Sequence, residues 1–319
     1  MKSTASSLIH TNIFKRFTGL IKAGRLAHAY LFTGPNGIGK VATALALARL
    51  VNCEKTGAEN CACSSCVKIA SGNHADVFVI EKLEDKTEIG IDQVREGVIP
   101  KLGLRPIEGR WRVCIIKDAD LLSEHAANAF LKTLEEPTPH TLLILVTAAP
   151  GRMMRTITSR CHEVRFFPMS NAELASKLKN EYDVASVEAD LLAKFSGGSP
   201  GRAAQMRDGF LEDKNAYLNE FVFSPANEVV FKKFAADKDL TRELCGVLLT
   251  FFRDLLLLHS GAGEEAIFHR DRLVDLRRLA PKYAPADLER IISQIVQVRQ
   301  AADENFNVKI ALMVLREMI

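Results

Sequence analysis

The chain has 319 residues, more than one hydrophobic core usually organises, so its length favours two or three domains. Hydrophobic residues make up 47% of it and charged residues 25%, which excludes a disordered or fibrous protein. Lys and Arg number 42 against 39 Asp and Glu, and a net charge of +3 is too small for the whole surface to attract nucleic acid. Any contact with nucleic acid is therefore expected to be local.

The most apolar run of the chain, from Leu244 to His259, contains Arg253 and Asp254. A membrane span needs a longer uncharged stretch, so none is expected. The N-terminal sequence has neither the apolar core nor the cleavage site of a signal peptide, which predicts a cytoplasmic protein in a reducing compartment. The cysteines are accordingly expected to be thiols or metal ligands before they are disulfides.

Short apolar runs alternate with helical patterns in the first half of the chain. The runs are Ala29 to Thr33, Val77 to Ile80, Arg112 to Ile116, Leu142 to Thr147 and Val164 to Phe167. Because these runs are apolar on both faces, they predict the buried strands of a parallel five-stranded sheet with crossover helices. The predicted fold class of residues 1–168 is α/β.

From Ser170 onward the apolar spacing is helical throughout. A small helical lid domain is predicted over 169–208, with a break at Ser196 to Gly201. The polar stretch from Arg207 to Asn219 is the candidate link to a last block, and 209–319 is predicted to be an all-α domain.

The first predicted strand runs into a glycine-rich loop and then a helical pattern. The loop and the next residue are Gly34, Pro35, Asn36, Gly37, Ile38, Gly39, Lys40 and Val41. This G-x-x-x-x-G-K spacing between strand and helix is typical of a loop whose N–H groups and Lys bind nucleotide phosphates; the alternative is a glycine-rich turn without a ligand. The Ser or Thr that would bind Mg²⁺ is replaced by Val41, and Thr43 lies too far round the helix to substitute for it.

The third predicted strand leads into Lys117, Asp118, Ala119 and Asp120, where an ATPase would carry two adjacent acids. If Lys117 holds the metal-side position, a positive charge replaces the metal ligand. If Asp118 holds it, Ala119 takes the water-activating position. In both registers the acidic pair is incomplete, so binding of ATP or ADP is expected to be weak and hydrolysis poor or absent.

Several phrases of the sequence, in this order, resemble the clamp-loader branch of the AAA+ proteins, and within it the delta-prime type of bacterial DNA polymerase III. They are RLAHAYLFTGPNGIGK, the cysteine cluster, IDQVRE, NAFLKTLEEP, SRC and GGSPGRA, with a collar-like NFNVKIAL near the end. The resemblance implies an AAA+ domain, a lid and a collar in a hetero-pentamer with gamma/tau and delta subunits. Such an assembly opens a sliding clamp and places it on primer-template DNA. Val41 and Lys117 depart from the gamma/tau motor type and fit a stator.

The same resemblance implies roles for three further residues. Arg160, in SRC, corresponds to an arginine finger that acts in trans on a neighbouring subunit's nucleotide; the alternative is a surface Arg paired with a carboxylate. Thr147 corresponds to a residue that senses the γ-phosphate, or is a hydrogen-bonded strand end. Arg202 corresponds to a lid Arg that contacts nucleotide.

Four cysteines, Cys53, Cys61, Cys63 and Cys66, lie within one short stretch. Four thiolates so close in sequence predict a structural, tetrahedral Zn²⁺ site, with free thiols as the alternative. The middle spacing is one residue shorter than the usual C-x2-C. Cys161 has no recognisable catalytic partner and is expected to pack.

Two other functions compete with a stator. An active gamma/tau-type ATPase would need a hydroxyl at Val41 and an acid at Lys117. An AAA+-based DNA-binding regulator would need a helix-turn-helix or zinc-finger reader, whereas 209–319 shows amphipathic helical patterns only.

Overall fold

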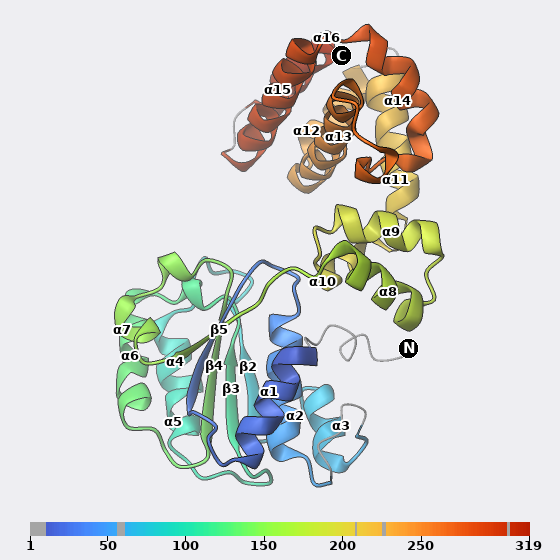
Figure 1. Ribbon diagram of the computed structural model, residues 1–319. Coiled ribbons are helices and arrows are strands. Elements are labelled where there is room, and N and C mark those ends of the chain that lie inside the picture. Colours follow the sequence, from blue (N-terminus) through green and yellow to red (C-terminus); the bar gives the residue numbers. More distant parts are fainter. Residues whose placement is uncertain (1–10, 56–60, 208, 225–227, 305–306) are drawn as a thin grey trace. The chain divides into compact units, whose positions relative to one another are not determined.

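The computed structural model describes residues 11–55, 61–207, 209–224, 228–304 and 307–319 (Figure 1). They form two compact units. The first comprises the described residues up to Val184 together with Ser196–Ala204, and the second comprises Ala185–Phe195 with the described residues from Gln205 to Ile319. A separate lid domain over 169–208 stays a prediction.

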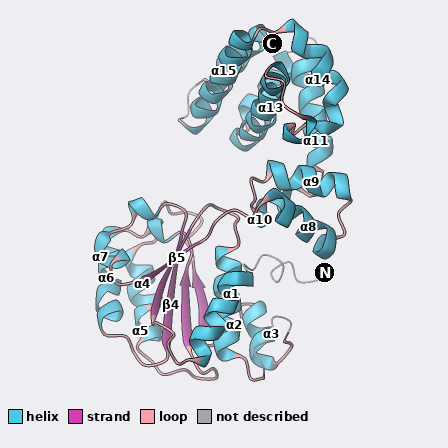
Figure 2. Ribbon diagram, in the orientation of Figure 1, coloured by secondary structure: helices cyan, strands magenta, loops and turns pink. Residues whose placement is uncertain are grey.

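A parallel sheet organises the first unit (Figure 2). Its strands are β1 (Ala29–Thr33), β2 (Val77–Ile80), β3 (Arg112–Ile116), β4 (Thr141–Thr147) and β5 (His162–Arg165). The five strands lie in the order β2-β3-β4-β1-β5, and all pairs are parallel. Thr33 at the end of β1 is in register with Thr147 at the end of β4, so both carboxyl ends reach the same edge of the sheet.

Helices cover both faces of this sheet (Figure 1). They are α1 (Thr11–Lys22), α2 (Lys40–Asn52), α3 (Ser64–Ala70), α4 (Ile91–Gly97), α5 (Ile99–Leu102), α6 (Glu124–Glu135) and α7 (Arg155–Thr158). Alternate strand residues point to opposite faces: Phe32 of β1 packs with Leu47 of α2, and its neighbour Leu31 packs with Phe130 of α6. The predicted α/β fold with a parallel five-stranded sheet is confirmed.

The fifth strand differs from the prediction in its bounds. It was expected at Val164 to Phe167 and lies at His162–Arg165, where only Val164 is buried. As an edge strand β5 has one neighbour and an exposed side, so its sequence lacks a continuous apolar run. Phe166 is buried just beyond the strand and donates its N–H to the carbonyl of Thr33.

From Ser170 onward the described elements are helical, as expected. They are α8 (Asn171–Tyr182), α9 (Ser186–Phe195), α10 (Pro200–Met206), α11 (Phe210–Leu218), a π-turn η3 (Asn219–Phe223), α12 (Glu228–Ala236), α13 (Lys238–His259), α14 (Leu273–Leu279), α15 (Pro285–Asp303) and α16 (Val308–Met318). Short 3₁₀ turns are η1 (Ala119–Leu121), η2 (Pro150–Arg152), η4 (Glu264–Ala266), η5 (Arg270–Arg272) and η6 (Ala280–Lys282).

The polar stretch expected to be a link is instead largely a helix. It contains α11, whose Tyr217 and Leu218 are buried in the core of the second unit beside Phe251 of α13. Phe210 also packs against this core, so the apolar side chains of α11 fix a helix whose middle residues are polar.

Among the described helices, none combines the length and the apolar composition that crossing a lipid bilayer requires.

Candidate functional site

The glycine-rich loop connects β1 to α2 and has the backbone geometry that its glycines allow. Gly34, Gly37 and Gly39 have φ values of 144°, 73° and 97°, a region that other residues rarely adopt. A Cβ on Gly34 would lie 2.4 Å from the carbonyl oxygen of Phe166. The loop therefore needs glycine both for its turn and for its close approach to the segment after β5.

Lys40 begins α2 and is folded back onto the loop. Its Nζ donates to the carbonyl oxygens of Gly34 at 2.5 Å and Pro35 at 2.7 Å, and only 6% of the residue is exposed. Burial lowers the pKa of Lys40, while the carboxylates of Asp118 and Asp120 oppose that shift. The ammonium group that would contact phosphate is thus held by the loop's own carbonyls.

No side-chain hydroxyl occupies the position after Lys40. Val41 packs against the apolar cluster between α2 and the sheet. Thr43, the nearest hydroxyl on the same helix, is fully buried and donates to the carbonyl of Gly39 at 2.9 Å. Its hydroxyl is engaged by the helix backbone, and that Thr43 does not replace the Mg²⁺ ligand stays a prediction.

The charged residues of the segment after β3 have different partners. The charges of Asp118 and Asp120 affect Lys40, whereas Lys117 pairs with Glu81, with 2.5 Å between Nζ and Oε2. Asp118 has the left-handed φ of 47°, which reverses the chain directly after the strand. The choice between Lys117 and Asp118 for the metal-side position stays a prediction.

Asp120 is a site residue that the sequence reasoning did not single out. It accepts a hydrogen bond from the buried hydroxyl of Thr147, and that same hydroxyl accepts the N–H of Ala149 at 2.9 Å. The sequence did contain an indication of Asp120, because it is an acid two residues after Asp118. Thr147 is thus a hydrogen-bonded strand end that also links β4 to the acidic segment.

The start of α10 contacts the loop within the first unit. The N–H of Gly201 donates to the carbonyl of Gly37 at 2.8 Å, and Ser199 Oγ lies 3.4 Å from the carbonyl of Asn36. A Cβ on Gly37 would lie 3.2 Å from Cγ of Arg202. The fold therefore brings Arg202 to the same loop as Lys40.

Arg160 lies away from this group, at the surface after α7. Its Nε and Nη2 donate to Oε1 of Glu135 at 3.0 and 2.6 Å, and its Nη1 donates to the carbonyl of Thr156 at 2.9 Å. The two side chains remain 36% and 51% exposed. Arg160 is a surface cation held by a carboxylate of its own chain.

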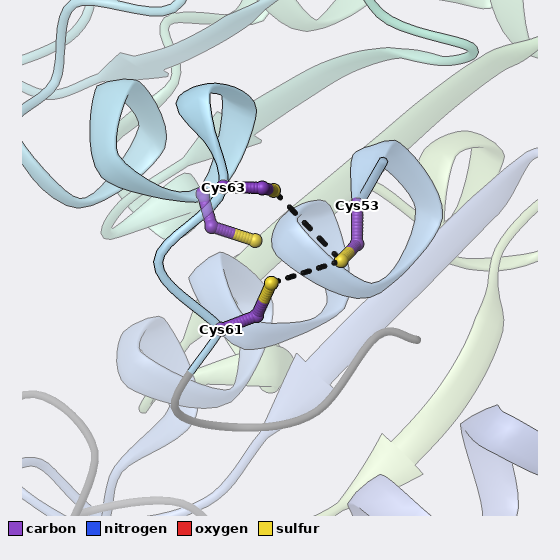
Figure 3. A group of neighbouring side chains, drawn as sticks. Cys53, Cys61 and Cys63 are labelled. Carbon is purple, nitrogen blue, oxygen red and sulfur yellow. Dashed lines mark hydrogen bonds between the residues drawn. The ribbon is translucent and has the colours of Figure 1, made fainter. Parts of the chain in front are cut away.

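The four clustered cysteines converge between α2 and α3 (Figure 3). Cys53 ends α2, Cys63 precedes α3 and Cys66 lies in its first turn. The sulfur of Cys53 lies 3.6 Å from that of Cys61 and 4.0 Å from that of Cys63, and all four sulfurs lie within 4.8 Å of one another. Although the spacing between Cys61 and Cys63 is short, both sulfurs lie in the same cluster.

The surroundings of these sulfurs favour the thiolate of Cys63 and disfavour those of Cys61 and Cys66. Arg49 donates to the carbonyl of Cys61 at 3.2 Å, hydrogen-bonds the Cys66 sulfur, and has a buried Nε without an acceptor among the described residues. Burial and, after it, the hydrogen bond with Cys63 raise the pKa of Cys66 to about 12. Burial also disfavours the Cys63 thiolate, but the N–H groups of Cys66 and Glu54 outweigh it and lower the pKa of Cys63 to about 6.

Buried polar side chains hold the neighbouring loop against the cysteine cluster, and the sequence reasoning missed them. Asn52 accepts the N–H groups of Arg110 and Trp111 at 2.8 Å, and Arg110 donates to the carbonyl of Cys53. The buried carboxylate of Asp76 accepts three successive backbone N–H groups of residues 107–109 and pairs with Arg112 at 2.8 Å. In the sequence, the only indication of Asn52 and Asp76 is that each is a polar residue beside an apolar run.

The strand order β2-β3-β4-β1-β5, with a phosphate-type loop after β1, defines the chain as a P-loop protein of the AAA+ class. A solved structure supports this assignment of the fold. A DNA polymerase III gamma subunit-related protein from Thermotoga maritima superimposes with a TM-score of 0.50 at 18% identity, over 96% of this chain and 97% of that one.

The chain belongs to the family described as "DNA polymerase III, delta subunit", which matches residues 9–170, and the C-terminal family of the same description matches residues 209–318. A DNA polymerase III subunit delta' from Bacillus subtilis is 30% identical over 94% of this chain and 93% of its own length. Its Escherichia coli counterpart is 29% identical over 90% of this chain and 86% of its own length.

Proposed function

We propose that this chain is a delta-prime-type clamp-loader subunit of a bacterial DNA polymerase III, acting in the cytoplasm with the replisome. The observation that carries the proposal is similarity at about 30% identity to delta' subunits along nearly the whole chain, combined with a phosphate loop that lacks its Mg²⁺ hydroxyl. In this function the subunit is a stator that helps open a sliding clamp and load it on primer-template DNA.

The chain's own loop binds ATP or ADP weakly and does not turn it over. The contacts of Lys40 with the carbonyls of Gly34 and Pro35 would have to break before phosphate could take their position. Val41 supplies no Mg²⁺ ligand, and Asp118 lacks an adjacent second acid. Weak binding without catalysis suits a subunit that keeps one conformation.

Arg160 acts in trans on nucleotide held by a neighbouring gamma/tau subunit. A guanidinium is always charged and fits phosphate oxygens, and Arg160 is held at the surface rather than in its own nucleotide loop. The contribution of this chain to chemistry thus falls in another subunit's site.

The cysteine cluster binds one structural Zn²⁺. Tetrahedral Zn–S bonds of about 2.3 Å put the sulfurs about 3.8 Å apart, and the separations of 3.6 and 4.0 Å around Cys53 fit that value. Arg49 and Arg110 would offset the negative charge of four thiolates. Cys53, Cys61, Cys63 and Cys66 are the proposed ligands, and the ion would hold the end of α2 to the start of α3.

The second unit provides a surface for assembly with gamma/tau and delta subunits. On α16, Ile310, Met313 and Val314 share one helical face and are 57%, 41% and 43% exposed. Contiguous exposed apolar residues of this kind mark protein interfaces. We expect Met313→Lys to weaken assembly, while Val274→Lys, at a single exposed valine on α14, should not.

An active gamma/tau-type ATPase is the main competitor, favoured by an intact Lys40 and two nearby carboxylates. It conflicts with Val41, whose side chain packs into the core. The DNA-binding regulator has no comparable support, because both C-terminal and N-terminal family matches are to DNA polymerase III subunits.

Reconstitution tests the proposed function. The chain should co-elute with gamma/tau and delta subunits on size exclusion, and the mixture should load a sliding clamp on primed DNA only when this chain is present. Met313→Lys should lower the co-eluting fraction, with Val274→Lys as the control. A chain that elutes alone, or loading that is independent of it, would contradict the proposal.

A further inference from the structure

The contact between Arg160 and Glu135 has a specific geometry. The carboxylate oxygen Oε1 of Glu135 takes the Nε side of the guanidinium, and the carbonyl of Thr156 takes one proton of Nη1. A guanidinium has five N–H donors, and two of them belong to Nη2, which gives only one to Glu135. Nη1 also lies 3.5 Å from Oγ of Ser159, so the carboxylate holds one edge of the group while the second N–H of Nη2 remains for another acceptor.

Glu135 is presented by a firmly anchored helix end. It is the last residue of α6, and the preceding Leu134 is buried in the core with its carbonyl 2.9 Å from Nε2 of His28. The N–H of Glu136 closes the helix on the carbonyl of Lys132 at 2.9 Å. The backbone that carries the carboxylate is therefore fixed against the sheet.

The backbone of Arg160 is anchored in the same layer. Its N–H donates to the carbonyl of Ile157 at 3.1 Å, and the Ile157 side chain is buried in the cluster that also contains Leu134. Arg160 and Glu135 are thus exposed side chains of opposite charge whose backbones are anchored to the same hydrophobic cluster. Their contact selects one conformation of a side chain that otherwise has many rotamers.

We propose that Glu135 is a positioning residue for Arg160: it holds the guanidinium by its Nε edge so that the Nη end faces an anionic phosphate of a neighbouring subunit's nucleotide. This inference rests on the proposed function of Arg160 in trans. An ion pair this exposed adds little to folding stability, so its main consequence is the orientation of the Arg side chain. Preorganised donors stabilise developing charge better than donors that must first be ordered.

The test is a set of variants in reconstituted clamp-loader complexes, with the rate of clamp loading measured at saturating ATP. We expect Glu135→Ala to slow loading by about three- to tenfold, less than Arg160→Ala, because a misplaced finger is weakened rather than removed. Glu135→Gln keeps an acceptor at the same position and should recover part of the rate. Glu136→Ala is the matched control, since Glu136 is exposed next to Glu135 and forms no ion pair among the described residues.

The double variant separates positioning from a general structural effect. In an Arg160→Ala background, Glu135→Ala should cause no further loss, since Glu135 acts through Arg160. An additive loss, or unchanged loading by Glu135→Ala alongside slow loading by Arg160→Ala, would overturn the inference and leave the trans role intact. If Arg160→Ala itself loads normally, the trans role fails first.

Discussion

Lys40 and Arg160 are two of the cations of this chain that are expected near nucleotide, and their surroundings differ. Lys40 is almost fully buried and donates to two carbonyls of its own loop. Arg160 is 36% exposed and is held at the surface by Glu135. Both are engaged within their own chain, but Arg160 keeps one N–H of Nη2 at the surface, where another acceptor can reach it.

The difference shows that the presence of a motif does not decide its use. The glycine spacing of the loop is complete, but Val41 and the incomplete acids remove the metal chemistry that would follow phosphate binding. The segment around Arg160 has no such defect. On the proposed function, a subunit with this combination contributes to a neighbour's site more than to its own.

The largest effect is expected from Arg160→Ala. Loss of an arginine finger costs about 10³ or more in rate at the site that depends on it. In a complex with several ATP sites, bulk hydrolysis should fall far less than clamp loading does. Both rates are measured in complexes reconstituted with wild-type or variant chain.

Arg165→Ala is the matched control for that variant. Arg165 is also a surface arginine paired with a glutamate, Glu163, in the first unit. If the two variants load clamps equally well, Arg160 is an ordinary surface residue and the contrast with Lys40 disappears.

The next largest effect is expected from a substitution in the cysteine cluster. This motif has all four of its cysteines, just as the segment around Arg160 has all its residues. Cys63→Ser should abolish the one equivalent of Zn²⁺ expected per chain. Loss of a structural metal site should cost about 2 kcal/mol or more, which lowers Tm by about 4–8 °C or more in a unit of this size. Elemental analysis and thermal unfolding check it. Cys161→Ala, outside the cluster, is the control, and equal metal content in both variants would exclude Cys63 as a ligand.

A smaller effect is expected from restoring the missing hydroxyl. The wild-type chain alone should release phosphate more slowly than about 1 s⁻¹. Val41→Thr should strengthen Mg²⁺-dependent ATP binding by about fivefold, equivalent to about 1 kcal/mol, without restoring turnover. Calorimetric titration with and without Mg²⁺ measures it, and Val41→Ala controls for side-chain size. Equal affinities of the two variants would show that position 41 does not face the metal.

The smallest effect is a pH dependence of stability at Lys40. Because burial lowers its pKa in the folded chain, the unfolded chain binds more protons between that pKa and the ordinary value of about 10.4. The free energy of unfolding of the wild type should therefore rise, relative to that of Lys40→Met, as pH increases toward 10. Urea unfolding at pH 7 and 9.5 measures the difference. An opposite slope would mean that Asp118 and Asp120 outweigh the effect of burial.

Most strands were predictable from the sequence, including the edge strand β2, whereas β5 and α11 were not. β1 and β3 have the predicted bounds because every residue of both strands is buried. The predicted bounds of β5 were wrong because this strand buries only Val164. α11 was predicted to be a link because its polar residues obscure the apolar spacing that includes Tyr217.

The candidate site divides in the same way. The phosphate loop and the cysteine cluster are local in sequence, so spacing alone located them. The partners of Arg160 and Thr147 could not be located, since Glu135 is 25 residues from Arg160 and Asp120 is 27 residues from Thr147. Contacts over such separations depend on which strands lie side by side, and a single sequence does not contain that information.

The most direct test of whether this chain acts on a neighbour rather than on its own nucleotide compares two variants in one assay. Complexes carrying Lys40→Met or Arg160→Ala are assembled with the same partner subunits, and the rate of clamp loading on primed DNA is measured. The account predicts that Lys40→Met loads at the wild-type rate and that Arg160→Ala is slow. Slow loading by Lys40→Met with normal loading by Arg160→Ala would contradict it.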